Sequence, residues 1–426
     1  MANTKALEAL RQQLPALQAT HEQFKAAGLA LDMTRGKPCK QQLDLSVAML
    51  NNLSTDEYRA ADGTDARNYG GIDGLLEAKA LLGELLDVPP EAVLVGDNSS
   101  LSLMAFTVAQ AMSHGVVGSA APWREQQPKF LCPVPGYDRH FSICQHWGIE
   151  MPLVEMREDG PDMDAVEAMV AGDGSIKGMW LVPKYSNPTG VTFSERVVER
   201  LAKMKTAAPD FRLFWDNAYA VHHLTSSPPK LANILDLCRE AGNPDRVFIY
   251  GSTSKITFAG AGLAAMAASA ANLDWMRKHR SMVTIGPDKI NQLRHVKFLK
   301  NGAGVAAHMR RHAEIIGPKF TAVQGVLQSE LGESDVEAGL ASWTKPVGGY
   351  FISLDTPDGC AKRVVQLAAE AGVKLTSAGA TFPYGKDPRD RNIRIAPTLP
   401  SLDEIEKATR VLANCIKLAV LEKSGS

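Results

Sequence analysis

The sequence places one lysine where a buried strand is expected to end. Lys255 follows the apolar run 247–250 and a short turn that contains Ser252. Burial disfavours the charged form of an amine, so a lysine in this position is more often neutral and nucleophilic near neutral pH. Such a lysine can form a Schiff base with a carbonyl group. The ordinary alternative is a solvated loop lysine that takes part in no reaction. The residues at the other strand ends distinguish these two interpretations.

Two further strand ends carry polar groups. Asp216 comes directly after the apolar run 213–215, and Tyr219 follows three residues later. Asn187 begins an Asn-Pro-Thr-Gly turn behind another predicted strand. Each group has a simpler explanation, since Asp216 can be an N-cap and the turn can be only a turn. Their occurrence on successive strand ends favours a common site.

The two earliest strand ends offer an aromatic ring and hydroxyl groups. Tyr137 lies in a Pro-Gly-Tyr turn after the predicted strand 129–132. Ser99 and Ser100 open a helix after the strand 92–95, and the free amides of a helix start favour an anion. A plain N-cap at Asn98 or Ser99 explains the same residues equally well.

Pyridoxal phosphate would use all of these groups. Its aldehyde needs a lysine, and its pyridine nitrogen needs a carboxylate. Its ring oxygen needs neutral donors, its ring face a flat partner, and its phosphate amides and hydroxyls.

Alternating helices and short apolar strands extend from about residue 67 to 250, which predicts an α/β fold with a mainly parallel sheet covered on both faces. In such sheets the ligand lies at the carboxyl ends of the strands. Single helices are expected over 5–28, 272–299, 305–331 and 402–421. We divide the chain into an N-terminal arm with part of a small domain (1–66), a large cofactor-binding domain (67–303) and a small α+β domain (304–426).

The composition excludes several classes of protein. The chain has 426 residues, so two domains are expected, and its 46 basic and 47 acidic residues form no long block of one sign. We therefore expect neither a nucleic-acid surface nor a membrane anchor, and charges near the start argue against a secretory signal and for a cytoplasmic protein. The six cysteines are scattered, which predicts free thiols. His308 and His312 share a helical spacing, but Arg310 and Arg311 between them argue against a metal site.

Taken together, the motifs resemble those of the class I/II aminotransferases, pyridoxal-phosphate enzymes of fold type I. They are RNYGG at 67–71, PGY at 135–137, NPTG at 187–190, DNAY at 216–219, STSK at 252–255, KPVGGYF at 345–351 and IRI at 393–395. The resemblance extends from about Leu31 to the last predicted helix. It is strongest to an atypical bacterial branch, the subgroup Ic aspartate aminotransferases. It implies a large domain with a mainly parallel mixed sheet flanked by helices, and a smaller α+β domain.

The resemblance implies a role for each strand-end residue. Lys255 resembles the lysine that holds the cofactor as an internal aldimine and then carries the substrate's α-proton. Asp216 resembles the partner of the pyridine nitrogen. Asn187 and Tyr219 resemble the donors to the ring oxygen, and Tyr137 the aromatic residue that stacks on the ring.

The remaining implied ligands come from several segments. Ser99, Ser100 and Ser252 resemble phosphate ligands, with Tyr69 joining them from the neighbouring subunit of a homodimer that shares its active sites. Arg394 resembles the arginine that binds the substrate α-carboxylate. Gly36 resembles the glycine whose backbone lies against the substrate, and its neighbour Arg35 is a candidate for the distal carboxylate.

Two positions depart from the family pattern. The arginine that usually neutralises the phosphate is replaced by Ala264, so a cation from elsewhere or additional hydroxyls must compensate. The arginine that usually binds the distal carboxylate has no aligned counterpart: Arg280 lies about one residue out of step. The competing cations are Arg35, Lys37, Lys289 and Arg294.

The expected function is therefore a pyridoxal-phosphate-dependent aminotransferase that moves the amino group of aspartate to 2-oxoglutarate by a ping-pong mechanism. The alternatives on the same fold are an aminotransferase with an aromatic or aminoadipate-type donor and a β-lyase. A non-catalytic, cofactor-binding regulator of transcription is disfavoured, because no basic helix pair precedes the first motif.

Overall fold

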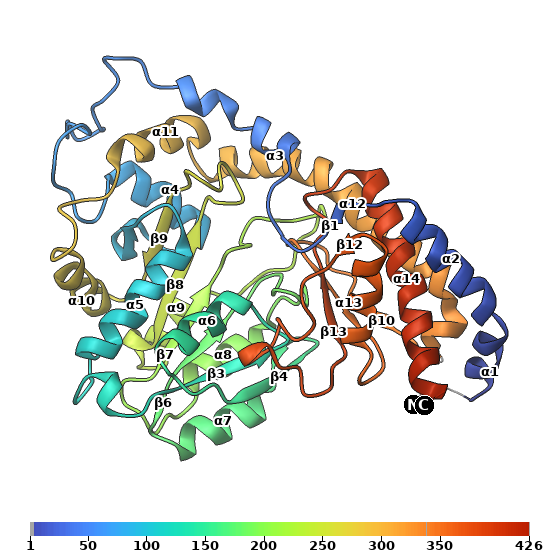
Figure 1. Ribbon diagram of the computed structural model, residues 1–426. Helices are drawn as coiled ribbons and strands as arrows, with labels where there is room; N and C mark the ends of the chain where they lie inside the picture. The colour runs from blue at the N-terminus through green and yellow to red at the C-terminus, as the bar shows by residue number, and fades with distance from the viewer. Residues whose placement is uncertain (1–3, 338, 426) are drawn as a thin grey trace.

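A sheet of eight strands lies at the centre of the larger part of the molecule (Figure 1). The computed structural model describes residues 4–337 and 339–425. The strands of this sheet are β2 (Val93–Val95), β3 (Lys129–Val134), β4 (Leu153–Arg157), β5 (Gly160–Pro161), β6 (Ile176–Leu181), β7 (Arg212–Asp216), β8 (Val247–Ser252) and β9 (Ala264–Ala267).

The strand directions bring six carboxyl ends to one edge of the sheet. The strand order is β2-β9-β8-β7-β6-β3-β4-β5, and β8, β7, β6, β3 and β4 are parallel neighbours. β9 is antiparallel to both β2 and β8, so β2 runs in the same direction as β8. The turns after β2, β3, β6, β7 and β8 therefore meet at the same edge, as the resemblance implied.

Alternate residues of the strands enter two different cores. On β7, Leu213 and Trp215 belong to one buried cluster, and Phe214 belongs to the other. This period of two is what a strand covered on both faces requires. Residues of α4, α7, α8, α9 and α11 line the first core, and residues of α5, α6 and α10 line the second. The bounds of these helices are α4 (Leu76–Leu86), α5 (Ser100–His114), α6 (Asp138–His146), α7 (Met163–Gly172), α8 (Glu195–Lys203), α9 (Ile234–Glu240), α10 (Ala270–Arg280) and α11 (Lys289–Leu299).

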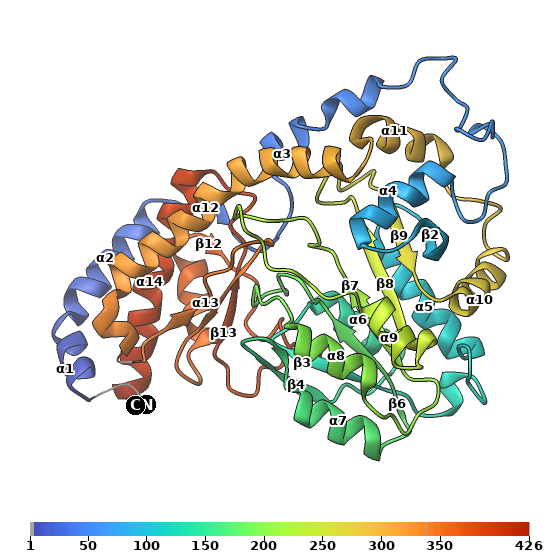
Figure 2. The same ribbon diagram turned by 180° about the vertical axis from the view of Figure 1, so that it is seen from behind.

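The N-terminal and C-terminal segments pack together in the smaller part of the molecule. Its helices are α1 (Thr4–Gln12), α2 (Leu14–Ala26), α13 (Ala361–Glu370) and α14 (Leu402–Gly425). Its strands are β1 (Leu31–Asp32), β10 (Ser342–Trp343), β11 (Ile352–Asp355), β12 (Val373–Lys374) and β13 (Asn392–Ile395). β1 pairs with β12, and β10, β11 and β13 form a second small sheet. The last helix lies beside the first two (Figure 2).

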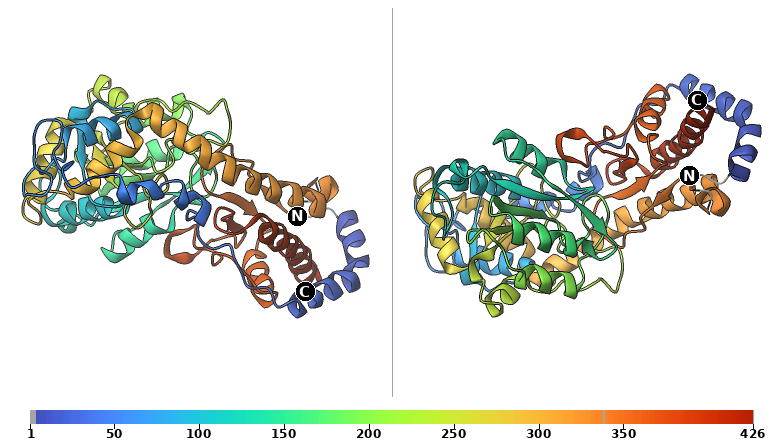
Figure 3. Two further views of the ribbon diagram at one scale, coloured as in Figure 1. Left: turned by 90° about the horizontal axis from the view of Figure 1, so that it is seen from above. Right: turned by 90° about the horizontal axis from the view of Figure 1, so that it is seen from below.

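One long helical segment, with a kink at Gly332, connects the two parts. α12 (Gly302–Glu337) starts beside α11 and α4 and continues to α14, as the views from above and below show (Figure 3). The short helix α3 (Lys40–Asp44) packs against it. The remaining 3₁₀ turns are η1 (Val47–Asn51), η2 (Pro90–Ala92), η3 (Trp123–Glu125), η4 (Pro244–Arg246) and η5 (Pro383–Gly385).

Two predicted single helices are each divided. The segment 5–28 forms α1 and α2, and the break falls at Gln13, just before the proline at the second position of α2. The segment 272–299 forms α10 and α11 on either side of a loop that contains Gly286 and Pro287. Proline removes a backbone donor, and Asp288 then caps the new helix by accepting from the backbone N–H of Asn291 at 2.9 Å.

The strand β9 is absent from the sequence-based prediction. Its residues are Ala-Ala-Met-Ala, which lack the β-branched and aromatic side chains typical of strands. Pairing with β2 and β8 on its two sides imposes the extended conformation.

None of the helices in the described ranges combines the length and apolar character that crossing a membrane requires. All six cysteines are free thiols, and all are buried.

Candidate active site

The site lies at the shared carboxyl edge of β2, β3, β6, β7 and β8. The turn after β8 reaches back to the turn after β2: Ser252 Oγ donates to Ser254 Oγ at 3.0 Å, and Ser254 Oγ donates to the Asn98 carbonyl at 3.3 Å. Ser99 caps α5, because its Oγ accepts from the backbone N–H of Ser102. Ser99, Ser100 and Ser252 thus lie on two turns in contact, at the N-terminus of a 15-residue helix. That is a suitable environment for an anion.

Asp216 is a buried carboxylate with one oxygen in use. It ends β7 and is only 2% exposed, and its Oδ2 lies 3.0 Å from Nε2 of His140. The His140 ring stacks on Trp180, with ring centroids 4.4 Å apart. Asp216 Oδ1 is buried and has no hydrogen-bond partner among the described residues. A buried carboxylate oxygen without a donor is costly, and a protonated pyridine nitrogen would satisfy it.

Lys255 lies against the aromatic rings of Tyr219 and Tyr350. Its Nζ is 4.9 Å from the first ring centroid and 5.9 Å from the second. Its backbone carbonyl accepts from the Tyr350 hydroxyl at 3.5 Å, which fixes the loop. Burial lowers the pKa of Lys255 from its usual 10.5, and the Asp216 carboxylate partly opposes this effect. The lysine therefore loses its proton more readily than an exposed one.

Burial favours the protonated form of Tyr137 and Tyr219. Burial raises the pKa of Tyr219 well above its usual range, so its hydroxyl can donate a hydrogen bond. Burial also raises the pKa of Tyr137. The ring of Tyr137 meets His140 edge-on, with centroids 4.9 Å apart. Tyr137 thus contacts the imidazole that is paired with Asp216.

Arg394 links the smaller part of the molecule to this edge. It lies on β13, and its Nη1 donates to Asp138 Oδ1 at 2.8 Å and to Asn187 Oδ1 at 3.4 Å. Its Cζ lies 4.9 Å from the centre of the Phe351 ring. A Cβ atom at Gly36 would lie only 2.3 Å from that ring, so only glycine fits there. The structure therefore brings Gly36 and Arg394 together at Phe351, and Asn187 against Arg394.

Two predicted ligands lie on the surface. The side chain of Tyr69 is 82% exposed, and the side chain of Arg35 is also exposed. No hydrogen bond or ion pair with another described residue holds either side chain in the site. Tyr69 was expected to act in a neighbouring subunit, and exposure leaves it accessible to one.

Two of the candidate cations are held by backbone carbonyls. Arg280 is buried and donates from Nη1 to the Val95 carbonyl at 3.0 Å, with its Nη2 3.8 Å from Asp97. It therefore supplies positive charge near the end of β2, close to Ala264, whose carbonyl accepts from Gly96. Lys289 is also buried, and its Nζ donates to the Gly70 carbonyl at 2.7 Å.

Sequence reasoning missed three residues of the site: His140, Asp138 and Phe351. Their position in the sequence could have indicated Asp138 and His140. Both follow Tyr137 in the first turn of a helix that starts at a strand end. Their partners Asp216 and Arg394 lie 76 and 256 positions away in the sequence, so no local pattern could pair them.

The histidine pair on α12 is engaged in hydrogen bonds. His308 Nε2 lies 2.8 Å from the Ile256 carbonyl, and His312 Nδ1 lies 3.0 Å from Gln42 Nε2. Among the described residues, no group of three or more His, Cys, Asp or Glu side chains is arranged to hold a metal ion.

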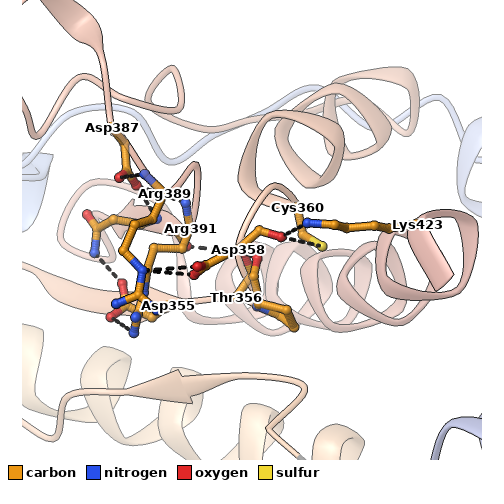
Figure 4. Close-up of polar contacts among 10 residues, drawn as sticks. Asp355, Thr356, Asp358, Cys360, Asp387, Arg389, Arg391 and Lys423 are labelled. Atoms are coloured by element: carbon orange, nitrogen blue, oxygen red, sulfur yellow. Dashed lines mark hydrogen bonds and ion pairs between the residues drawn. The ribbon is translucent and has the colours of Figure 1, made fainter. Parts of the chain in front are cut away.

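A separate cleft of about 820 Å³ opens at the outer edge of the smaller part of the molecule. Figure 4 shows its arginines, which are paired with acids: Arg389 with Asp358 at 3.0 Å and Arg391 with Asp355 at 2.6 Å. These internal pairs already neutralise the two arginines.

The residues at the sheet edge fit pyridoxal phosphate. The site offers an unpartnered buried carboxylate oxygen, a buried amine, a neutral phenol and serine hydroxyls at a helix N-terminus. With the fold, this donor set defines the class of the protein as an aminotransferase of fold type I. The aspartate amino-transferase family model matches residues 5–426, and the chain belongs to this family.

Individual relatives agree with this assignment. The chain is 49% identical over 402 residues to an aspartate aminotransferase of Corynebacterium glutamicum, covering 94% of this chain and 92% of that protein. The crystal structure of an aspartate transaminase from the same species matches with a TM-score of 0.94 and 47% identity over 98% of this chain and 97% of that one. The α-aminoadipate aminotransferase LysN of Thermus thermophilus matches with a TM-score of 0.74 and 21% identity over 96% and 97% of the two chains, which shows the shared fold.

Proposed function

We propose that this chain transfers the amino group of aspartate to 2-oxoglutarate, with pyridoxal phosphate bound at the shared carboxyl edge of the sheet. The proposal depends chiefly on the hydrogen bonding of the buried carboxylate Asp216. His140 contacts its Oδ2, but its Oδ1 has no hydrogen-bond partner in the described part of the chain. The near identity in fold to aspartate transaminases, at 47–49% sequence identity, supports aspartate as the donor.

When bound, pyridoxal phosphate supplies an aldehyde that captures the amino group and a ring that takes up electrons. Asp216 would keep the ring nitrogen protonated, and His140 holds the carboxylate in place. Tyr219 and Asn187 would donate to the ring oxygen. Ser99, Ser100 and Ser252 would bind the phosphate.

The protein's own groups would then perform the proton transfer. Lys255 has a lowered pKa, so its amine can accept the α-proton of the substrate and return it at a neighbouring carbon. Arg394 would bind the α-carboxylate and thereby orient the C–H bond toward the lysine. Phe351, under the guanidinium, limits the freedom of the arginine.

We further propose a homodimer in which Tyr69 reaches the site of the partner subunit. The exposed apolar side chains Met282, Val283 and Ile285 support this, because such a cluster is a typical protein–protein surface. The loop that carries them lies beside the Tyr69 loop, since a Cβ at Gly286 would lie 2.3 Å from the Gly70 carbonyl.

A donor panel tests the proposed function. Purified protein loaded with pyridoxal phosphate should convert 2-oxoglutarate to glutamate fastest with aspartate. A greater kcat/KM with an aromatic donor or 2-aminoadipate would assign the chain to one of the alternative donors. Release of pyruvate and ammonia from a β-substituted alanine, without transamination, would indicate a β-lyase.

A further inference from the structure

Asp138 forms an ion pair with Arg394, the arginine to which the proposed function assigns the substrate α-carboxylate. Its Oδ1 accepts from Nη1 of Arg394 at 2.8 Å, and this is the only carboxylate paired with Arg394 among the described residues. The side chain of Arg394 is 8% exposed and that of Asp138 is 35% exposed, so water screens the pair only in part.

The first turn of a helix is an ordinary place for an acid. Asp138 is the first residue of α6, where the helix dipole favours a negative charge. That role alone requires no partner on β13. The structure nevertheless directs the carboxylate to Arg394, across 256 positions of sequence.

The remaining contacts of Arg394 leave part of its guanidinium for a ligand. Nη1 also donates to Asn187 Oδ1 at 3.4 Å, and Phe351 covers the guanidinium at 4.9 Å. Nε is buried and has no partner in the described ranges. Asp138 and Asn187 therefore hold Nη1 of the guanidinium, while the Nε–H group has no acceptor among the described residues.

From this geometry we propose that Asp138 is a positioning residue that sets the affinity of Arg394 for the substrate α-carboxylate. This inference rests on the proposed function. The Asp138 carboxylate fixes the orientation of the Arg394 guanidinium. Its negative charge also offsets part of the positive charge that attracts the substrate. Substrate and product therefore bind more weakly than they would to an unpaired arginine, and the keto acid leaves more readily.

The two contributions can be separated by substitution. Asp138→Asn keeps an oxygen that accepts from Nη1 but removes the negative charge. The dissociation constant for maleate, a dicarboxylate with no amino group to transfer, should fall about tenfold, equivalent to about 1.4 kcal/mol. The KM for aspartate should fall by a similar factor. Loss of a purely structural role would not tighten binding.

The experiment is calorimetric titration of maleate into the wild-type and variant holoenzymes. Asp358→Asn is the matched control, because Asp358 pairs with Arg389 at 3.0 Å in the separate cleft (Figure 4). Tighter binding in Asp138→Asn alone is the expected result. Unchanged or weaker binding in that variant, or equal tightening in the control, overturns the inference. If the wild-type protein binds neither maleate nor aspartate, the proposed substrate class fails instead.

Discussion

His140 and Asp216 form a buried pair in which Nε2 lies 3.0 Å from Oδ2, while Oδ1 accepts no hydrogen bond from any residue that the structure describes. Asp216→Asn should lower kcat at least about 100-fold, the size expected when a preorganised electrostatic partner is removed. His140→Asn should lower kcat about tenfold, since it removes one charge-assisted hydrogen bond. Steady-state kinetics with aspartate and 2-oxoglutarate measures both effects.

The control for this pair is Asp210, a buried acid just before β7 that pairs with Lys177 on β6 at 2.8 Å. Asp210→Asn should reduce thermal stability and leave kcat almost unchanged. An equal loss of kcat in all three variants would mean that the kinetic effect reports only damage to the fold.

Gly36 is held against Phe351, and this contact predicts a substrate-binding defect. In Gly36→Ala the added methyl group would lie 2.3 Å from the ring. The ring must move, and Arg394 loses its packing surface. We expect KM for aspartate to rise about tenfold, because a displaced carboxylate-binding group loses on the order of 1.4 kcal/mol.

Gly317→Ala is the corresponding control, since a Cβ at this position of α12 meets nothing within 4 Å. Its kinetic constants should match those of the wild type. If Gly36→Ala also retains the wild-type KM, Gly36 has no role in placing Arg394.

The lowered pKa of Lys255 leads us to expect a specific pH dependence of folding stability in the protein prepared without cofactor. Burial lowers its pKa from 10.5 in the folded state, so the unfolded state binds more protons between the two values. Folding stability should therefore rise with pH in that window, by up to about 1.4 kcal/mol per pH unit. The reference is Lys255→Met, which lacks the titrating group.

The measurement is denaturant unfolding of both proteins from pH 7 to pH 10. The stability of the wild type relative to Lys255→Met should increase as the pH rises. A constant difference across this range would contradict a lowered pKa of the lysine within the range.

The exposed apolar loop predicts that dimer formation depends on Ile285, which is 62% exposed in the single chain. Ile285→Asp should weaken association in sedimentation velocity experiments and lower activity as the protein is diluted, because Tyr69 then leaves the partner site. Leu402→Asp changes another exposed apolar residue, on α14, and should leave association unchanged. A monomeric wild-type protein with full activity would refute the shared site.

The sequence predicted the polar strand ends because each is a local event. An apolar run followed by Asp216, or by Ser252 and Lys255, can be recognised within ten residues, and parallel strands bring such ends to one edge. In the structure these residues lie at the carboxyl edge of the large sheet. Their chemical roles are proposals that the variants above test.

What could not be predicted depends on distant contacts. The strand β9 has no strand-like residues and exists because two neighbouring strands pair with it. The division of 272–299 depends on a Gly-Pro turn inside an otherwise helical pattern. The pairing of Asp138 with Arg394 joins α6 to β13 across 256 positions of sequence, which no local periodicity encodes.

The proposed function requires Lys255 to transfer the α-proton of the substrate. The most direct test is to incubate aspartate with the wild type and with Lys255→Ala, both with pyridoxal phosphate, in deuterium oxide and to follow the α-proton by NMR. The wild type should exchange this proton rapidly, and the variant should exchange it at least about 100-fold more slowly, as expected for loss of a general base. Exchange by Lys255→Ala at the wild-type rate would contradict the account.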